Sequence, residues 1–172
     1  MIWHEIVKYS PENYNENGVY TKDEWISRSY IGIVYEGKPF TLGEYLDVEQ
    51  RYVNVVLSVM NATNCKYMTI QYLEADKNYI AKQIKVSKFR KIDSRLLSSV
   101  PLLEKNRKIS STKLSDILRL ALREYIYVVL SNKEHGVFVR FGYDYYLNIA
   151  CSLDNDVLED IVRKEGLFLD PR

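Results

Sequence analysis

A chain of 172 residues is long enough for one domain that buries about 70% of the surface its unfolded chain exposes. Such a chain needs neither a metal ion nor a disulfide to fold, and its apolar and charged fractions of 47% and 27% are ordinary for a globular protein. The 15 tyrosines, against 5 phenylalanines, favour half-buried sheets and wet interfaces, because tyrosine joins an apolar ring to a polar tip. We therefore expect one domain over residues 1–172.

Charge is unevenly distributed along the chain, although the net charge is only +1. Residues 1–76 hold 6 basic and 11 acidic side chains, residues 77–108 hold 10 and 2, and residues 109–172 hold 8 and 10. A basic segment of this kind binds nucleic acid or an acidic partner in some proteins and is a solvated face in others. Because both flanking segments are acidic, we do not favour nucleic acid as the partner.

The two cysteines, Cys65 and Cys151, lie in apolar runs and form no C-x-x-C pair. We expect two reduced, buried thiols in a cytoplasmic protein, because disulfides are rare in that compartment. The first ten residues lack the basic start and long apolar core of a signal peptide. No apolar stretch approaches the roughly 20 residues that span a bilayer, so we expect a soluble protein without a membrane partner.

In the N-terminal half, the clearest predicted element is a helix over residues 42–60. Thr41 and Glu44 match a capping box, and apolar residues then recur at three- and four-residue spacing as far as Met60. The apolar residues of the segment 65–73 fall on both sides of an extended chain, which predicts a central strand covered on both faces. Before the helix we expect a strand at 2–8, a loop at 10–18, a short helical turn capped by Thr21, and an extended piece with a turn at 36–39.

Residues 76–107 give no clear prediction. The pattern around Ile80 and Ile84 fits a helix or an alternating strand equally well, and Pro101 interrupts whatever element surrounds it. After this segment the expected elements are a helix capped by Ser111 or Thr112, strands at 125–130, 137–141 and 145–151, a helix capped by Asp154 or Asn155 with Gly166 just past its end, and a short edge strand near 167–169. The fold class is therefore α+β, with a mixed or antiparallel sheet packed against several helices.

A search for catalytic chemistry finds no convincing constellation. The seven glycines are scattered, so no phosphate-binding loop is present, and the paired carboxylates near helix starts are explained by the helix dipole. A zinc site would need all of His4, Cys65, His135 and Cys151, which are far apart in the sequence. Cys151 and His135 flank one aromatic run and are the weak candidates for a cysteine hydrolase. We expect no catalytic residue, no cofactor and no metal.

Three stretches of the chain, GVYTKDEW, FTLGEYLDVEQRYV and LREYIYVVL with VFVRFGYDYYLNIAC and EGLF, occur together in this order. Together they resemble immunity proteins of bacterial contact-dependent growth inhibition systems, which belong to polymorphic toxin–immunity pairs. The resemblance spans both ends of the chain, is weak from about residue 75 to residue 109, and rests on these words rather than on a catalytic motif. It implies a cytoplasmic protein without enzymatic activity that binds one cognate toxin domain one-to-one and blocks it.

In related pairs the toxin is often a nuclease, and some partners dock by β-augmentation, in which a toxin hairpin extends the immunity protein's sheet. A tyrosine-rich sheet with acidic flanks suits a nuclease, because a nuclease is itself basic where it holds nucleic acid. The alternative function is a nucleic-acid-binding module that uses the basic 77–108 segment. Its cations would be Lys82, Lys85, Lys88, Arg90, Lys91 and Arg95.

The aromatic run over residues 136–151 holds the predicted contact residues. Phe141 and Leu147 are expected in the core of a sheet. Asp144 is either the hydrogen-bonding residue of a bend or an interface anchor among outward tyrosines. The residues that we predict to bind the toxin are Tyr143, Asp144, Tyr145, Tyr146 and Glu134.

Overall fold

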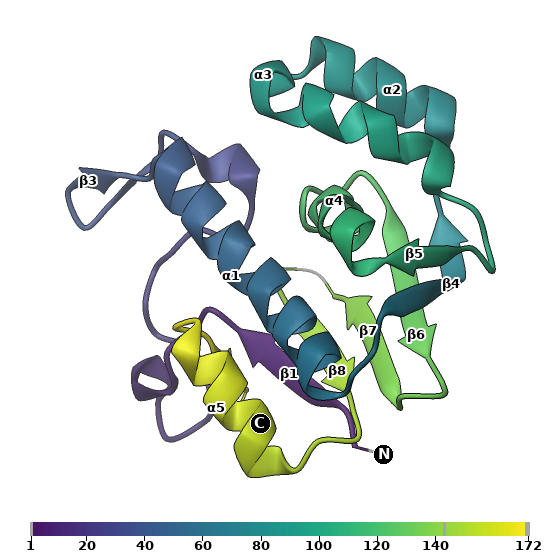
Figure 1. Ribbon diagram of the computed structural model, residues 1–172. Coiled ribbons are helices and arrows are strands. Elements are labelled where there is room, and N and C mark those ends of the chain that lie inside the picture. The colour runs from purple at the N-terminus through teal and green to yellow at the C-terminus, as the bar shows by residue number, and fades with distance from the viewer. Residues whose placement is uncertain (1, 143, 171–172) are drawn as a thin grey trace.

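One antiparallel sheet organises the fold and carries helices on one of its faces (Figure 1). The computed structural model describes residues 2–142 and 144–170. In this part of the chain the sheet has seven strands, in the order β5-β4-β6-β7-β8-β1-β9. Their bounds in that order are Lys108–Ser110, Tyr67–Glu74, Tyr127–Asn132, Val137–Phe141, Leu147–Ala150, His4–Val7 and Phe168–Leu169. The α+β prediction is therefore confirmed, and the sheet is antiparallel throughout.

Three helices cover one face of this sheet: α1 (Leu42–Ala62), α4 (Ser111–Leu122) and α5 (Asn155–Lys164). The predicted capping box is confirmed, since Thr41 Oγ1 accepts a hydrogen bond from the Glu44 N–H, and the Glu44 carboxylate accepts one from the Thr41 N–H. The apolar stripes of the three helices pack against the buried side of the strands. Phe141 and Leu147 of the sheet lie in this core, as predicted.

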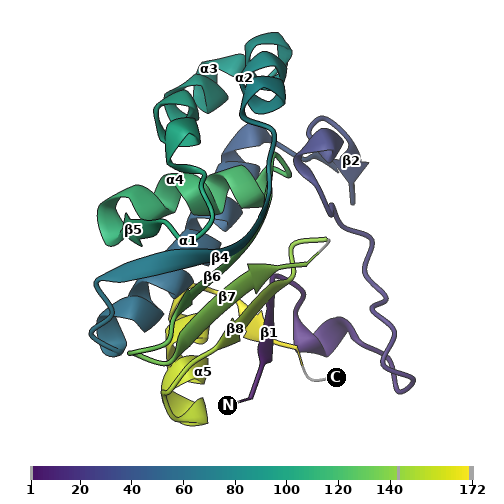
Figure 2. The same ribbon diagram turned by 90° about the vertical axis from the view of Figure 1, so that its right-hand side faces the viewer.

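The remaining elements lie beside these two layers, and some of their side chains, such as Trp25, Ile80 and Leu96, join the same hydrophobic core. Residues 77–102 fold into a helical lobe at one end of the molecule (Figure 2), made of α2 (Lys77–Val86), α3 (Arg90–Asp93) and a 3-10 segment (Ser94–Leu102). The short hairpin β2–β3 (Val34–Tyr35 and Lys38–Pro39) projects from the body, and 3-10 turns occupy Pro11–Asn13 and Arg28–Tyr30. In the described part of the chain, no helix has the length and apolar character needed to cross a membrane.

Four local predictions are wrong. Thr21 caps no helical turn, because its hydroxyl donates to the Asn13 carbonyl of the preceding loop. The helix expected to be capped by Ser111 or Thr112 has Ser110 at its N-cap instead. Asp154 does occupy the N-cap position of α5, as expected, but makes no side-chain capping bond. Strand β4 is covered on one face only, so its side chains alternate between buried and partly exposed. Cys65 is buried, whereas Cys151 is half-exposed.

Candidate partner-binding site

The face of the sheet opposite α1, α4 and α5 is called the open face here. Directly opposed residues of antiparallel strands point to the same side, so the register defines this face residue by residue. Glu5 is paired with Asn148, Asn148 with Arg140, Arg140 with Val129, and Val129 with Tyr72. This row crosses five strands from β1 to β4, and at its β4 end Glu74 is paired with Tyr127.

Two aromatic pairs lie on the open face. Tyr72 and Tyr127 contact each other edge-on, with ring centroids 5.9 Å apart, and their residues are 47% and 38% exposed. Trp3, 42% exposed, lies edge-on to Phe138 at 6.5 Å. Large apolar groups that stay exposed next to one another are typical of interaction surfaces.

A broad hollow of about 1010 Å³ is lined by open-face residues such as Glu5, Arg140 and Asn148, and by residues 124–126 of the connection from α4 to β6. Four carboxylates, Glu5, Glu74, Glu124 and Asp144, are among its described lining residues, together with one guanidinium, that of Arg140. Arg140 is already held in place, because it donates to Asn148 Oδ1 at 3.2 and 3.1 Å and lies 4.6 Å from the Trp3 ring centre. The hollow is therefore acidic, and it presents carboxylates to whatever enters it.

The turn between β7 and β8, residues 142–146, brings Asp144 to the rim of the hollow. Asp144 and Tyr145 both adopt left-handed backbone conformations, with φ of 56° and 64°. Such conformations cost a non-glycine residue about 1–2 kcal/mol. Two hydroxyls offset this cost: Tyr9 donates to the Asp144 carbonyl at 2.9 Å, and Tyr52 donates to the Tyr145 carbonyl at 2.7 Å. The backbone of Asp144 and Tyr145 is thus held by contacts from distant parts of the chain.

The structure separates the five predicted contact residues. The prediction that Tyr145 points outward is wrong: its ring is buried against Trp25, Tyr45 and Tyr52. Asp144 is exposed and Tyr146 is half-buried, and both line the hollow. Tyr143 lies outside the described residues.

Glu134 is exposed but sits in the β6–β7 turn, at the other end of β7 from Asp144. The five residues of β7 place these two turns on the order of 17 Å apart. Glu134 and Asp144 therefore do not belong to one compact site.

The Cys151–His135 pair does not have the setting of a cysteine nucleophile. Burial raises the pKa of the Cys151 thiol, whereas a reactive cysteine needs a lowered pKa. The His135 ring nitrogen Nδ1 lies 3.0 Å from the Thr63 carbonyl oxygen. Across residues 2–142 and 144–170, no three side chains of the His, Cys, Asp and Glu types gather closely enough to hold a metal ion.

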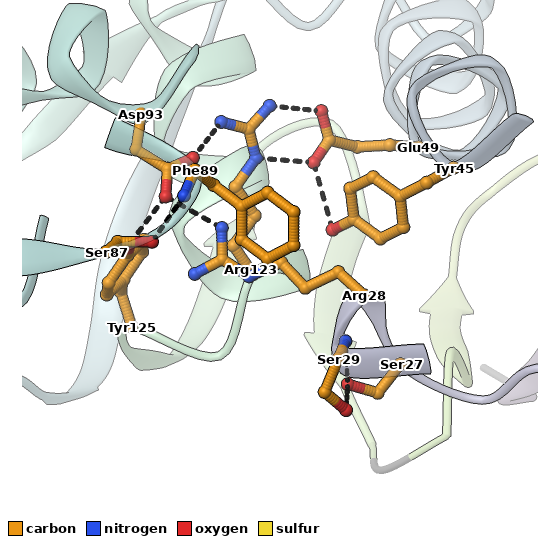
Figure 3. A network of polar contacts seen from close by, with 10 residues as sticks. All are labelled: Ser27, Arg28, Ser29, Tyr45, Glu49, Ser87, Phe89, Asp93, Arg123 and Tyr125. Carbon is orange, nitrogen blue, oxygen red and sulfur yellow. Dashed lines mark hydrogen bonds and ion pairs between the residues drawn. The ribbon is translucent and has the colours of Figure 1, made fainter. Parts of the chain in front are cut away.

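A second polar cluster lies inside the molecule, where the helical lobe meets the body (Figure 3). Arg123, after α4, donates to both carboxylate oxygens of Glu49 in α1 at 2.7 Å and to Asp93 Oδ1 in α3 at 2.6 Å. Asp93 Oδ2 also accepts from Arg28 at 2.8 Å and from the Tyr125 hydroxyl at 2.6 Å. Burial works to lower the pKa of Arg123, but Glu49 and Asp93 outweigh it and raise that pKa. This buried network joins the lobe to the rest of the fold.

Both edges of the sheet are short. Strand β5 has three residues and β9 has two. A partner strand at either edge would gain few main-chain hydrogen bonds, and short edges are a common protection against strand addition. The open face therefore offers more contact area than either edge.

Sequence reasoning missed the acidic residues of the hollow. Glu5, Glu74 and Glu124 are 119 residues apart at the extremes, and only the fold brings them together. The burial of Tyr145 could have been predicted. In an extended segment alternate residues point to the same side, and Tyr145 alternates with Phe141 and Leu147, which were expected in the core.

Comparison of the chain with protein-family models, with curated proteins and with solved structures finds no match.

Proposed function

We propose that this protein is an immunity protein that binds a basic toxin domain through its open face and blocks it. The observation that carries the proposal is the hollow of about 1010 Å³, with four carboxylates and one restrained guanidinium among its described lining residues. A nuclease domain presents cations where it holds nucleic acid, so its active surface complements this face. The resemblance to contact-dependent growth inhibition immunity proteins points to the same class of partner.

Binding at this face neutralises the toxin by occlusion. Lysine or arginine side chains of the toxin insert among Glu5, Glu74 and Asp144, and the toxin groove that would otherwise hold phosphate groups is thereby covered. The exposed rings of Tyr72, Tyr127 and Trp3 supply apolar area around the charged centre, which is the composition of a strong interface. A stable complex of this kind buries roughly 1,600 Å² in total.

The test uses the toxin domain encoded directly upstream of this gene, in a catalytically inactive form. Calorimetry measures its Kd for the wild-type protein, for the double variant Glu5→Lys/Glu74→Lys and for the matched control Glu12→Lys/Glu16→Lys. The control makes the same charge change on exposed residues of the N-terminal loop. Co-expression with the active toxin measures growth rescue.

We expect one-to-one binding, a Kd at least tenfold weaker for the open-face variant, and a control within about threefold of wild type, because contacting charges act more strongly than net charge. Absence of both binding and rescue with the wild-type protein would refute the immunity function for this pair. Equal weakening in both double variants would place the interface elsewhere. In that case the variant Asp144→Lys and a variant with a proline in β5 would show whether the interface lies at the β7–β8 turn or at the β5 edge.

A further inference from the structure

The helical lobe has a surface charge that its own acidic residues do not balance. Residues 77–108 hold ten basic and two acidic side chains. Asp93 is fully buried and bonded to Arg28 and Arg123 (Figure 3). Glu104 is paired with Lys77 and Arg107. Neither acid is left to neutralise the remaining cations.

Eight cations of this segment are exposed and make no ion pair within the described part of the chain. They are Lys82, Lys85, Lys88, Arg90, Lys91, Arg95, Lys105 and Lys108. Several are helical neighbours at three- or four-residue spacing, where like charges repel. A polyanion that bridges them would relieve this repulsion and release its own counterions.

An exposed aromatic ring accompanies these cations. Tyr79 is 60% exposed on α2, one turn before Lys82, and points away from the core that buries Ile80 and Ile84. At the base of the lobe, Tyr79 also lines a pocket of about 340 Å³ together with Lys88. A volume of this size lies in the range of small-ligand sites.

We propose that the helical lobe binds single-stranded nucleic acid. Phosphates contact the exposed lysines and arginines, and an unpaired base stacks on Tyr79, the combination by which single strands are held without sequence preference. An acidic peptide would use the cations but has no need of the exposed ring. This activity is independent of the toxin-binding function, since it uses residues 77–105 and not the acidic open face.

The test measures fluorescence anisotropy of a labelled 12-nucleotide oligo-U and oligo-dT with the full chain at 50 and 200 mM salt. If four phosphates are neutralised, the log–log salt slope is about −2.8, and affinity falls roughly 50-fold between these two salts. Lys82→Glu/Lys85→Glu should abolish binding. The matched control, Lys22→Glu/Lys133→Glu, changes two exposed lysines outside the lobe and should leave binding within threefold.

Tyr79→Ala separates nucleic acid from a general polyanion. We expect affinity to fall roughly 5- to 150-fold, the range for loss of one base-stacking ring, while Tyr79→Phe keeps wild-type affinity. Circular dichroism shows whether each variant is folded. Each of three results would overturn the proposal. The first is no binding at 50 mM salt, and the second is the same loss of affinity in Lys22→Glu/Lys133→Glu as in Lys82→Glu/Lys85→Glu. The third is an unchanged affinity of Tyr79→Ala together with equally tight binding of a 12-residue polyglutamate.

Discussion

Replacement of Arg123 by methionine should destabilise the protein more than any exposed charge change. The Arg123 side chain is 0% exposed and makes three charged hydrogen bonds, two to Glu49 and one to Asp93. Removal of one partner from a buried ion pair typically costs about 3–5 kcal/mol, because the other charge stays buried without compensation. We expect a loss of this size in the free energy of unfolding.

The two carboxylates are not equally affected by this change. Asp93 keeps Arg28 and the Tyr125 hydroxyl, whereas Glu49 keeps only weaker contacts, the Tyr45 hydroxyl at 3.2 Å and Arg119 Nε at 3.5 Å. Most of the loss therefore comes from Glu49. The double variant Glu49→Leu/Arg123→Met removes both charges, and it should be more stable than the sum of the two single losses predicts, by about 1–3 kcal/mol.

Urea denaturation of the two single variants and the double variant measures this coupling. Arg163→Met is the control, since Arg163 pairs with Glu159 on the exposed face of α5 and should cost at most about 1 kcal/mol. An Arg123→Met loss below about 1 kcal/mol would refute the reasoning. Strict additivity in the double variant would refute it too.

Three further predictions concern tyrosines and a helix cap. Tyr52→Phe leaves the buried Tyr145 carbonyl without its hydroxyl donor and should cost about 1–3 kcal/mol in thermal or urea unfolding, whereas Tyr79→Phe at the surface should have no measurable effect. Burial raises the pKa of Tyr9, Tyr52 and Tyr145, so the unfolded chain loses these protons at a lower pH than the folded chain does, and the free energy of unfolding should fall as pH rises above 10. Titration of all tyrosines near pH 10, read by absorbance at 295 nm on the folded protein, would contradict this. Thr41→Ala should lower the free energy of unfolding by about 1 kcal/mol at pH 7. Because hydrogen bonds from Thr41 lower the pKa of Glu44, part of the difference between the variant and the wild type should disappear as pH falls through the pKa of Glu44 in the folded protein. A difference that does not depend on pH would count against the capping box.

Elements with a local signal could be predicted from the sequence. The Thr41–Glu44 capping box and the apolar spacing after it located the start of α1, and β-branched and aromatic runs located β6 and β7. Gly166 was expected just past α5, and it has a φ of 66° there. In each case the residues that determine the element lie within a few positions of it.

Features set by distant contacts could not be predicted in this way. The pattern around Ile80 and Ile84 fitted a helix and an alternating strand equally well. The segment is helical because this conformation buries both side chains in the lobe. The backbone of Asp144 and Tyr145 is held by Tyr9 and Tyr52, which are 135 and 93 residues away in the sequence. The acidic open face likewise exists only once the strand order is known.

The position of β1 in the sheet has a consequence for synthesis of the protein. Ile6 is paired with Leu147 on one side and Leu169 on the other, so β1 has no neighbouring strand until β8 and β9 are made. At about 5–20 residues per second, a ribosome needs roughly 7–30 s to reach residue 150 after making β1. Throughout that interval Glu5 and the strand that carries it cannot take their native place. A newly made molecule therefore gains its complete open face only after β8 has been made.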